Sequence, residues 1–386
     1  MKNKLGRWLA GAAGCVVAAS LALAAQAADP IKIGVTFDAA KQASYYSQLQ
    51  KGSLEVYEKE LNAKGGVIGR PISFVFEDDE NNPTTAAQKV EKLADEGVSF
   101  IIQIGSSATG LAAQSKAQEI GIPNGSPMNV ADKLTSPKVP SFYFRTALRD
   151  NTATAAIIAY MKAKKPNPRV AVVRDNSETG LVSSDAQIAM LKAAGLEPVA
   201  VEQIPTGASS VTAQAVRVKT ANPDFVLLAG GSIPELANYV KAHRSLNNPA
   251  EMIGGNLLAV PSFPELSGKA ANGVIFADAV DMTRSDVKAV EAKLVAEKGK
   301  QLANSVHAIF AWAYADLVVD AIRQANSADR QAVRAAMEDI KDHKTLLGPA
   351  GTVVRFKPGM HDALDQTDQV VLRLIEDGKF GGAVKR

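Results

Sequence analysis

The sequence predicts an α/β protein of two Rossmann-like lobes, each built around a parallel sheet. Short apolar runs alternate with longer stretches of helical periodicity, which is typical of parallel strands covered by helices on both faces. This series occurs twice along the chain at similar length, and 386 residues are enough for two domains. Because no low-complexity linker separates the two series, we expect crossing segments that act as a hinge.

The first residues predict an export signal. Basic residues precede an apolar stretch, residues 8–25, which ends in the small-x-small pattern Ala25-Gln26-Ala27. The stretch is too rich in small residues for a membrane anchor, which needs about 20 strongly apolar residues. We therefore expect export of the protein and cleavage near Ala27.

Removal of that signal changes the charge balance and the cysteine content. The full chain has 43 Lys+Arg and 40 Asp+Glu, and three basic but no acidic residues precede residue 28, which leaves 40 of each sign. A balanced mature chain gives no reason to expect nucleic acid as a partner. Cys15 lies within the apolar stretch, so the mature chain has no cysteine and depends on a large core, which its length allows.

The first series opens with an apolar run of strand length, Ile31 to Phe37. The helical stretch after it stops at Gly65 and Gly66, where a glycine supplies a left-handed cap. Two further pairs of strand and helix follow, and then a loop at 128–131. The expected strands are 31–37, 71–78 and 98–105, and the expected helices are 42–63, 84–96 and 109–120.

The second series follows a short extended segment at 142–146. Its helices are expected at 150–164, 182–194, 211–221 and 234–245, and its strands at 169–174, 198–203, 224–230 and 251–254. After an apolar segment at 273–279 the chain is expected to return to the first lobe through two long helices, 286–303 and 307–325. The tail is expected to form an edge hairpin of two strands, 352–356 and 369–375.

These elements give the expected domain boundaries. Residues 1–27 form the export signal, 28–148 and 279–350 form lobe 1, and 149–278 and 351–386 form lobe 2. In open parallel sheets, ligands bind outside the carboxyl ends of the strands, so two facing sheets place those ends around one cleft. We expect the cleft to be formed by the loops 37–46, 105–109, 128–131, 174–180, 230–233 and 255–258.

One of these loops has the chemistry of an anion site. Ser106 and Ser107 follow an apolar strand and precede a helix, and a helix start presents free N–H groups and a positive dipole end. The two serines are candidates to bind a ligand carboxylate. The alternative is that they only cap the helix.

The sequence does not contain the machinery of an enzyme. The four histidines are scattered without metal-pair spacing, and we interpret each as a surface or core residue. Nucleophile-elbow, Walker A and dinucleotide motifs are absent from the sequence. Asp175 and Glu178 lie near the expected cleft, but no second feature gives them an acid or base role. We expect a protein that is not an enzyme and holds no metal or cofactor.

Several segments of the mature chain resemble the leucine/isoleucine/valine-binding proteins, which are substrate-binding components of hydrophobic amino-acid ABC transporters. The resemblance implies a type I periplasmic binding protein with a three-segment hinge, a small-molecule ligand, ABC permease subunits as partners and a monomeric state. The segments that carry it are IKIGVTF at 31–37, LNAKGG at 61–66, GRP at 69–71, DD at 78–79, NP at 82–83, IGSS at 104–107, VVRD at 172–175, DFV at 224–226 and GP at 348–349.

The resemblance also implies which residues bind the ligand. In the first lobe, Ser106 and Ser107 at the Gly105 turn correspond to the residues that bind a carboxylate, and Tyr45 corresponds to a tyrosine that closes over the ligand. In the family a run of small residues contacts the ligand, and its positions correspond here to Met128, Asn129 and Val130. The second-lobe positions correspond to Thr179, Ser232 and Asn256.

Asn256 departs from the family pattern, because a glutamate that pairs with the ligand's ammonium stands at this position in the family. A buried ammonium without an anionic partner costs several kcal/mol of desolvation, which a neutral Asn does not fully offset. The expected ligand is therefore a small carboxylate with an apolar body, such as an aromatic or branched organic acid. The alternatives are a hydrophobic amino acid, with Asp175 or Glu178 as the missing anion, and a ligand-sensing subunit.

Overall fold

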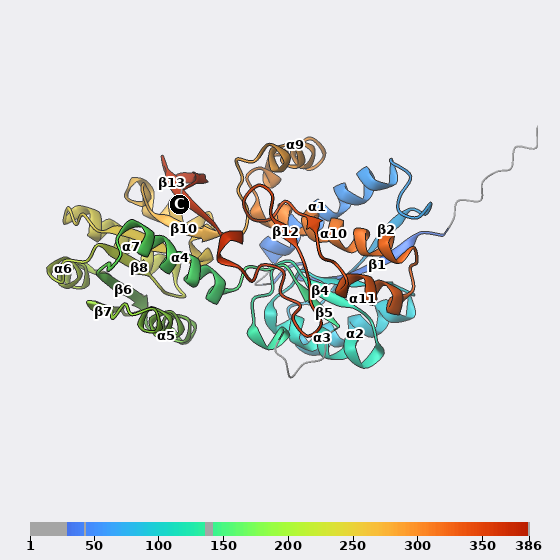
Figure 1. The fold of residues 1–386 in the computed structure, drawn as a ribbon, viewed down its shortest axis with the longest axis horizontal. Coiled ribbons are helices and arrows are strands. Elements are labelled where there is room, and N and C mark those ends of the chain that lie inside the picture. Colours follow the sequence, from blue (N-terminus) through green and yellow to red (C-terminus); the bar gives the residue numbers. More distant parts are fainter. Residues whose placement is uncertain (1–28, 42–43, 136–141, 385–386) are drawn as a thin grey trace, which may run out of the picture.

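The computed structural model describes residues 29–41, 44–135 and 142–384, so the predicted export signal lies outside the described residues. Two lobes lie side by side, each with a sheet between layers of helices (Figure 1). This arrangement confirms the predicted fold class. In the described part of the chain, no helix combines the length and apolar character needed to cross a membrane.

The first lobe contains a five-stranded parallel sheet in the order β2-β1-β3-β4-β5. Its strands are β1 (Ile31–Phe37), β2 (Ile72–Asp78), β3 (Ile101–Gln103), β4 (Asn124–Ser126) and β5 (Tyr143–Arg145). Helices α2 and α3 cover one face of the sheet, and α1, α10 and α11 cover the other. The helices of this lobe are α1 (Ser44–Asn62), α2 (Pro83–Asp95), α3 (Ser107–Ile120), α9 (Ser285–Lys298), α10 (Val306–Ala325) and α11 (Arg330–Glu338).

The second lobe contains a seven-stranded sheet in the order β14-β13-β10-β9-β8-β6-β7. Strand β13 pairs antiparallel with both of its neighbours, and the other pairs are parallel. The strands are β6 (Val170–Asp175), β7 (Ala200–Ile204), β8 (Phe225–Leu228), β9 (Glu251–Gly254), β10 (Ile275–Asp278), β13 (Val371–Glu376) and β14 (Lys379–Ala383). The helices are α4 (Asp150–Lys164), α5 (Glu178–Ala193), α6 (Thr212–Thr220), α7 (Ile233–Ser245) and α8 (Ser262–Ser267).

Strand β6 shows why the central strands lack polar alternation. Val170 and Val172 pack in the hydrophobic cluster that contains residues of α4, whereas Ala171 and Val173 pack in the cluster of α6 and α7. Both faces of the strand are therefore buried, and a parallel sheet covered by helices on both sides requires apolar residues at every position.

The tail differs from the expected hairpin. Residues 353–354 (β12) pair with 343–344 (β11) in a separate two-stranded ribbon, whereas β13 pairs with β10 and β14. Val354, Phe356 and Ala363 pack in the core of the first lobe, so the chain passes to the second lobe after residue 363 and not at 351. A turn-rich segment can run along the edge of a sheet without forming a long strand. The sequence pattern does not distinguish such a segment from a hairpin of two paired strands.

Three segments join the lobes: residues 146–149 between β5 and α4, 279–284 between β10 and α9, and 364–370 before β13. The third follows a stretch that lies along β5, where the Arg145 N–H donates to the His361 carbonyl and the Ala363 N–H donates to the Arg145 carbonyl at 2.8 and 2.9 Å. The first and third segments therefore leave the first lobe from the same edge of its sheet.

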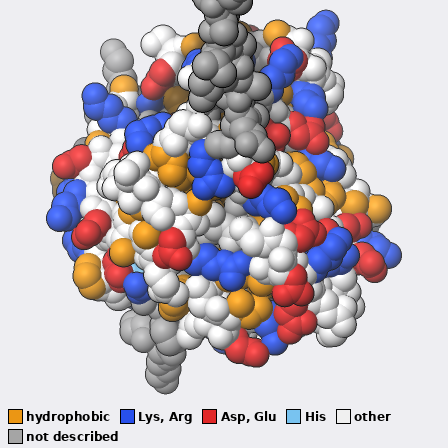
Figure 2. Space-filling view, turned by 90° about the vertical axis from the view of Figure 1, so that its right-hand side faces the viewer, with side chains coloured by type: hydrophobic (Ala, Val, Ile, Leu, Met, Phe, Trp, Pro, Cys, Tyr) orange, Lys and Arg blue, Asp and Glu red, His pale blue; other side chains and the backbone are white. Residues whose placement is uncertain are grey.

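Basic and acidic side chains are interspersed over the face of the first lobe that Figure 2 shows. This surface agrees with the equal numbers of basic and acidic residues in residues 28–386.

Candidate ligand-binding site

A cavity of about 400 Å³ lies between the two lobes, at the carboxyl ends of strands from both sheets. Leu228 is the last residue of β8 and Gly230 follows it, Gly255 and Asn256 follow β9, and Met128 lies in the loop after β4. This is the position that the topology predicts for a ligand. Four of the six loops expected to form the cleft contribute to its wall, and the loops at 105–109 and 174–180 do not.

Three of the predicted site residues line the cavity, namely Met128, Val130 and Asn256. Tyr46 also lines it, whereas the predicted Tyr45 is 55% exposed and packs edge-on against Tyr46 with ring centroids 5.3 Å apart. The tyrosine in the wall is therefore the neighbour of the predicted one.

Ser106 and Ser107 do not line this cavity. Ser106 is the N-cap of α3, and its Oγ accepts a hydrogen bond from the Thr109 N–H at 3.3 Å. The structure thus shows the capping interaction that was the alternative interpretation, and the role of these serines in ligand binding stays a prediction. Gly105 lies close to Asp79, whose Oδ2 is 2.6 Å from the position of a Cβ at residue 105.

Asn129 and Ser232, two of the remaining predicted residues, are not part of the cavity wall. Asn129 is buried beside Met128, and both of its side-chain polar atoms lack a hydrogen-bond partner among the described residues. Thr179 belongs to the first turn of α5, and its side chain lies outside the described part of the structure. Ser232 follows the cavity residue Gly231 and donates its backbone N–H to Asp175 Oδ2 at 2.9 Å.

Asp175 is not available as the missing anion. Its carboxylate accepts hydrogen bonds from the backbone N–H groups of Ser177, Gly231 and Ser232, and it does not line the cavity. Burial raises the pKa of Asp175, but these bonds, with one from the Ser177 hydroxyl, outweigh burial and lower it. Asp175 therefore holds the loop after β8 in place. The Glu178 side chain lies outside the described part of the structure.

Two other acidic side chains, Asp150 and Asp278, line the cavity. Asp278 is 2% exposed and forms an ion pair with Arg373, with Oδ2 2.6 Å from Nη1. Asp150 is the first residue of α4, a helix whose N-terminus has no side-chain cap. The cavity wall is therefore acidic on balance, although Asp278 already has a cationic partner.

His307 is a cavity residue that the sequence interpretation missed. It lies in the first turn of α10 against Tyr46 and Phe310, with ring centroids at 4.4 and 5.5 Å, and all three line the cavity. Burial lowers the pKa of His307 to about 4, so the ring is neutral at pH 7. His307 lies in the first turn of a helix and not in one of the loops after the strands, which are the segments expected to form the cleft.

Two buried histidines are expected to lower the free energy of unfolding in acid. Burial lowers the pKa of His243 and of His307 to about 4, whereas an unfolded histidine titrates near 6.5. Between these values the unfolded state binds more protons, so the free energy of unfolding falls as pH drops from about 6.5 to 4, by about 1 kcal/mol per pH unit for each histidine. Asp79, whose pKa burial raises to about 6, opposes part of this loss.

Urea unfolding of the wild type and of His307→Phe at several values of pH measures this effect. The variant keeps an aromatic ring between Tyr46 and Phe310, and its free energy of unfolding should depend less steeply on pH. Equal slopes for the two proteins would show that His307 does not titrate as described.

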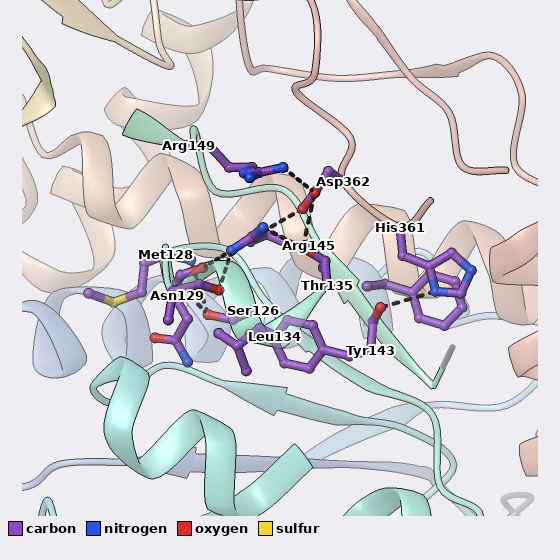
Figure 3. A network of polar contacts seen from close by, with 12 residues as sticks. Ser126, Met128, Asn129, Leu134, Thr135, Tyr143, Arg145, Arg149, His361 and Asp362 are labelled. Carbon is purple, nitrogen blue, oxygen red and sulfur yellow. Dashed lines mark hydrogen bonds and ion pairs between the residues drawn. The ribbon is translucent and has the colours of Figure 1, made fainter. Parts of the chain in front are cut away.

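The loop that carries Met128 and Val130 is held by a buried network of polar contacts (Figure 3). Arg145, at the end of β5, is fully buried, and its Nε lies 2.6 Å from Asp362 Oδ1. Its Nη1 donates to the Ala131 carbonyl at 2.9 Å, and Ser126 Oγ accepts from the Met128 N–H at 3.1 Å. The backbone of the loop is therefore held by contacts within the protein.

The Asp362 carboxylate also contacts the segment that leads into the second lobe. Asp362 Oδ2 accepts from Arg149 Nη1 at 3.2 Å, and Arg149 is the residue before α4 (Figure 3). Asp362 thus contacts the residue that fixes the cavity loop and the segment that enters lobe 2. Within the described residues, no group of three or more His, Cys, Asp or Glu side chains is placed to hold a metal ion.

Comparison with known proteins agrees with this architecture. The periplasmic binding protein family matches residues 30–364. The Leu/Ile/Val-binding protein BraC3 of Rhizobium johnstonii is 29% identical over 332 residues, which are 86% of this chain and 89% of that protein. Leu/Ile/Val-binding protein homolog 1 of Brucella abortus is 25% identical over 336 residues, 87% of this chain and 89% of that protein.

Solved structures share the fold. The leucine binding protein LivK of Thermotoga maritima superposes with a TM-score of 0.71 at 21% identity, covering 92% of this chain and 98% of that one. The substrate binding protein LivJ of Streptococcus pneumoniae, in complex with isoleucine, gives 0.71 at 22% identity and covers 92% and 99%. The match along residues 30–364 and the two-lobed fold show that the chain belongs to the periplasmic binding protein family, in its leucine/isoleucine/valine-binding-like type I class.

Proposed function

We propose that the protein is the periplasmic substrate-binding component of an ABC importer and captures a hydrophobic amino acid between its lobes. The observation that carries this proposal is the cavity of about 400 Å³ at the carboxyl ends of both sheets. Its wall is mostly apolar, with residues such as Val130, Leu257 and Phe310, and a few polar groups converge on it. The names of the relatives support an amino acid over the organic acid expected from the sequence.

The carboxylate of such a ligand needs hydrogen-bond donors. Helices α4 and α10 both begin at the cavity, where Asp150, Val306 and His307 lie in the wall. Helix starts favour an anion through their free N–H groups and dipole. Ser106 and Ser107 remain the donors predicted from the resemblance, and contact with them requires the ligand to extend beyond the present cavity.

Ligand capture in this proposal is a shift between open and closed arrangements of the lobes. The ligand first contacts the first-lobe wall at Met128 and Val130, and rotation about the three crossing segments then brings Asn256 and Gly230 against it. Closure is favoured only by contacts that exist in the closed state. Permease subunits recognise the closed form, and no chemical step occurs on the ligand.

A branched or aromatic organic acid is the second candidate. Asn256 lines the cavity where the family has an ammonium-binding glutamate, and Asp278 is already paired with Arg373. Both features weaken the case for a buried ammonium.

Isothermal titration of the mature chain with L-leucine and L-phenylalanine, and with the 2-oxo acid of each, separates the two candidates. We expect saturable 1:1 binding of at least one of the amino acids. Binding of the 2-oxo acids alone would establish the second candidate, and the absence of binding by all four compounds would contradict the proposed function.

A further inference from the structure

Two polar atoms on residues of the cavity wall are buried and have no hydrogen-bond partner among the described residues. Gln187, on α5 of the second lobe, is 7% exposed, and none of the described residues donates a hydrogen bond to its Oε1. His307, on α10 of the first lobe, has an unpartnered Nδ1. A buried polar atom without a partner destabilises the protein, so such atoms in a native structure need an explanation.

The chemistry of these atoms defines the group that would satisfy them. The Gln187 oxygen is an acceptor only. His307 is neutral at pH 7, so one of its ring nitrogens accepts and the other donates. An amino group can donate to both residues when His307 Nδ1 is the acceptor. A hydroxyl group can donate to Gln187 Oε1 and accept from His307 when Nδ1 carries the proton, whereas a carbonyl leaves the Gln187 oxygen unsatisfied.

The charges of the cavity wall do not oppose such a group, although Asp278 is already paired with Arg373. Among its described lining residues the cavity has two carboxylates, Asp150 and Asp278, and no lysine or arginine. Arg373 pairs with Asp278 and does not line the cavity. The neighbourhood of Gln187 also has room, because a Cβ placed on Gly255 would lie 4.0 Å from Gln187 Nε2.

We propose that Gln187 and His307 are specificity-determining residues that bind a hydrogen-bond-donating substituent on the carbon next to the ligand carboxylate. The proposal rests on the proposed function and deepens it, since it selects amino or hydroxy acids over oxo acids. The two residues come from opposite lobes, so a ligand group that bonds both draws the lobes together. These two neutral side chains take the place of the family's glutamate, whose position is Asn256 here.

Four compounds that differ only in this substituent test the proposal by isothermal titration. They are L-leucine, 2-hydroxy-4-methylpentanoate, 4-methyl-2-oxopentanoate and 4-methylpentanoate. The wild type should bind the amino or the hydroxy acid about tenfold more tightly than the oxo and unsubstituted acids. Preference for the amino over the hydroxy compound identifies the substituent as an ammonium group.

Substitutions at Gln187 show whether this residue causes the preference. Gln187→Leu should reduce the preference to about twofold or less, because it removes the acceptor and keeps a similar volume. Gln187→Glu keeps an acceptor and should retain the preference. Asn248→Ala removes a buried amide of the same lobe outside the cavity and controls for a general loss of stability.

His307→Phe tests the contribution of the first lobe in the same titrations. It should also reduce the preference for the amino or hydroxy acid over the oxo and unsubstituted acids. Binding of the series with an unchanged preference in both Gln187→Leu and His307→Phe would overturn this inference and leave the proposed function intact. Failure of the wild type to bind any of the four compounds would count against both.

Discussion

Gly255→Phe is expected to abolish ligand binding while the protein stays folded. Gly255 lines the cavity, its φ of −78° suits any residue, and the nearest atom to an added Cβ is 4.0 Å away. The Cβ of the new side chain therefore has room, and we expect the ring to occupy space that the ligand needs. We expect affinity for L-leucine in isothermal titration to fall on the order of 100-fold or more, since overpacking an occupied cavity costs about 1–3 kcal/mol or more.

The matched control for this variant is Gly255→Ala. The methyl group fits in the same open space, so Gly255→Ala should bind L-leucine within a few-fold of the wild type, and both variants should keep the wild-type melting temperature to within a few degrees. A folded Gly255→Phe protein that binds as the wild type does would show that the ligand occupies another site.

Asp362→Ala is expected to destabilise the protein by about 3–5 kcal/mol, because it leaves the charge of the fully buried Arg145 without its anionic partner. Folded domains have a total stability of only about 5–15 kcal/mol, so this loss is large. Urea unfolding measures it. We also expect weaker ligand binding, because Arg145 holds the cavity loop through the Ala131 carbonyl.

An exposed ion pair supplies the control for this prediction. Arg217 is 56% exposed where it pairs with Glu202, so Glu202→Gln should cost less than about 1 kcal/mol. The double variant Arg145→Met/Asp362→Leu removes both charges and should be more stable than Asp362→Ala. A loss below about 1 kcal/mol in Asp362→Ala would contradict the role assigned to this network.

Much of the fold could be predicted from the sequence, because a parallel sheet covered on both faces needs strands that are apolar throughout. Strand β6 illustrates this, since its residues pack alternately in two different hydrophobic clusters. Elements that depend on tertiary pairing were missed. Strand β14 (KFGGA) contains two glycines and forms through its pairing with β13, and α11 (RQAVRAAME) is short and buries only Val333, Ala336 and Met337.

Site residues could be predicted from the sequence where the order of strands and loops alone determines their position. The loops after β4, β8 and β9 supply Met128, Gly230 and Asn256 because strand ends converge at the cleft. Gln187 and His307 are separated by about 120 positions and meet the cavity through the packing of α5 and α10, which no local pattern reports. Asp175 lies at the end of a strand that points toward the cleft, so its position in the sequence suggested a ligand contact. Its carboxylate instead accepts hydrogen bonds from the loop after β8 and holds that loop in place.

A crystal structure of the mature protein grown with saturating L-leucine tests the central claim most directly. We expect one leucine in the cavity between the lobes, in contact with Met128 or Val130 on one side and with Asn256 or Gln187 on the other. Leucine bound on the outer surface of one lobe, or an empty cavity at saturating leucine, would contradict it.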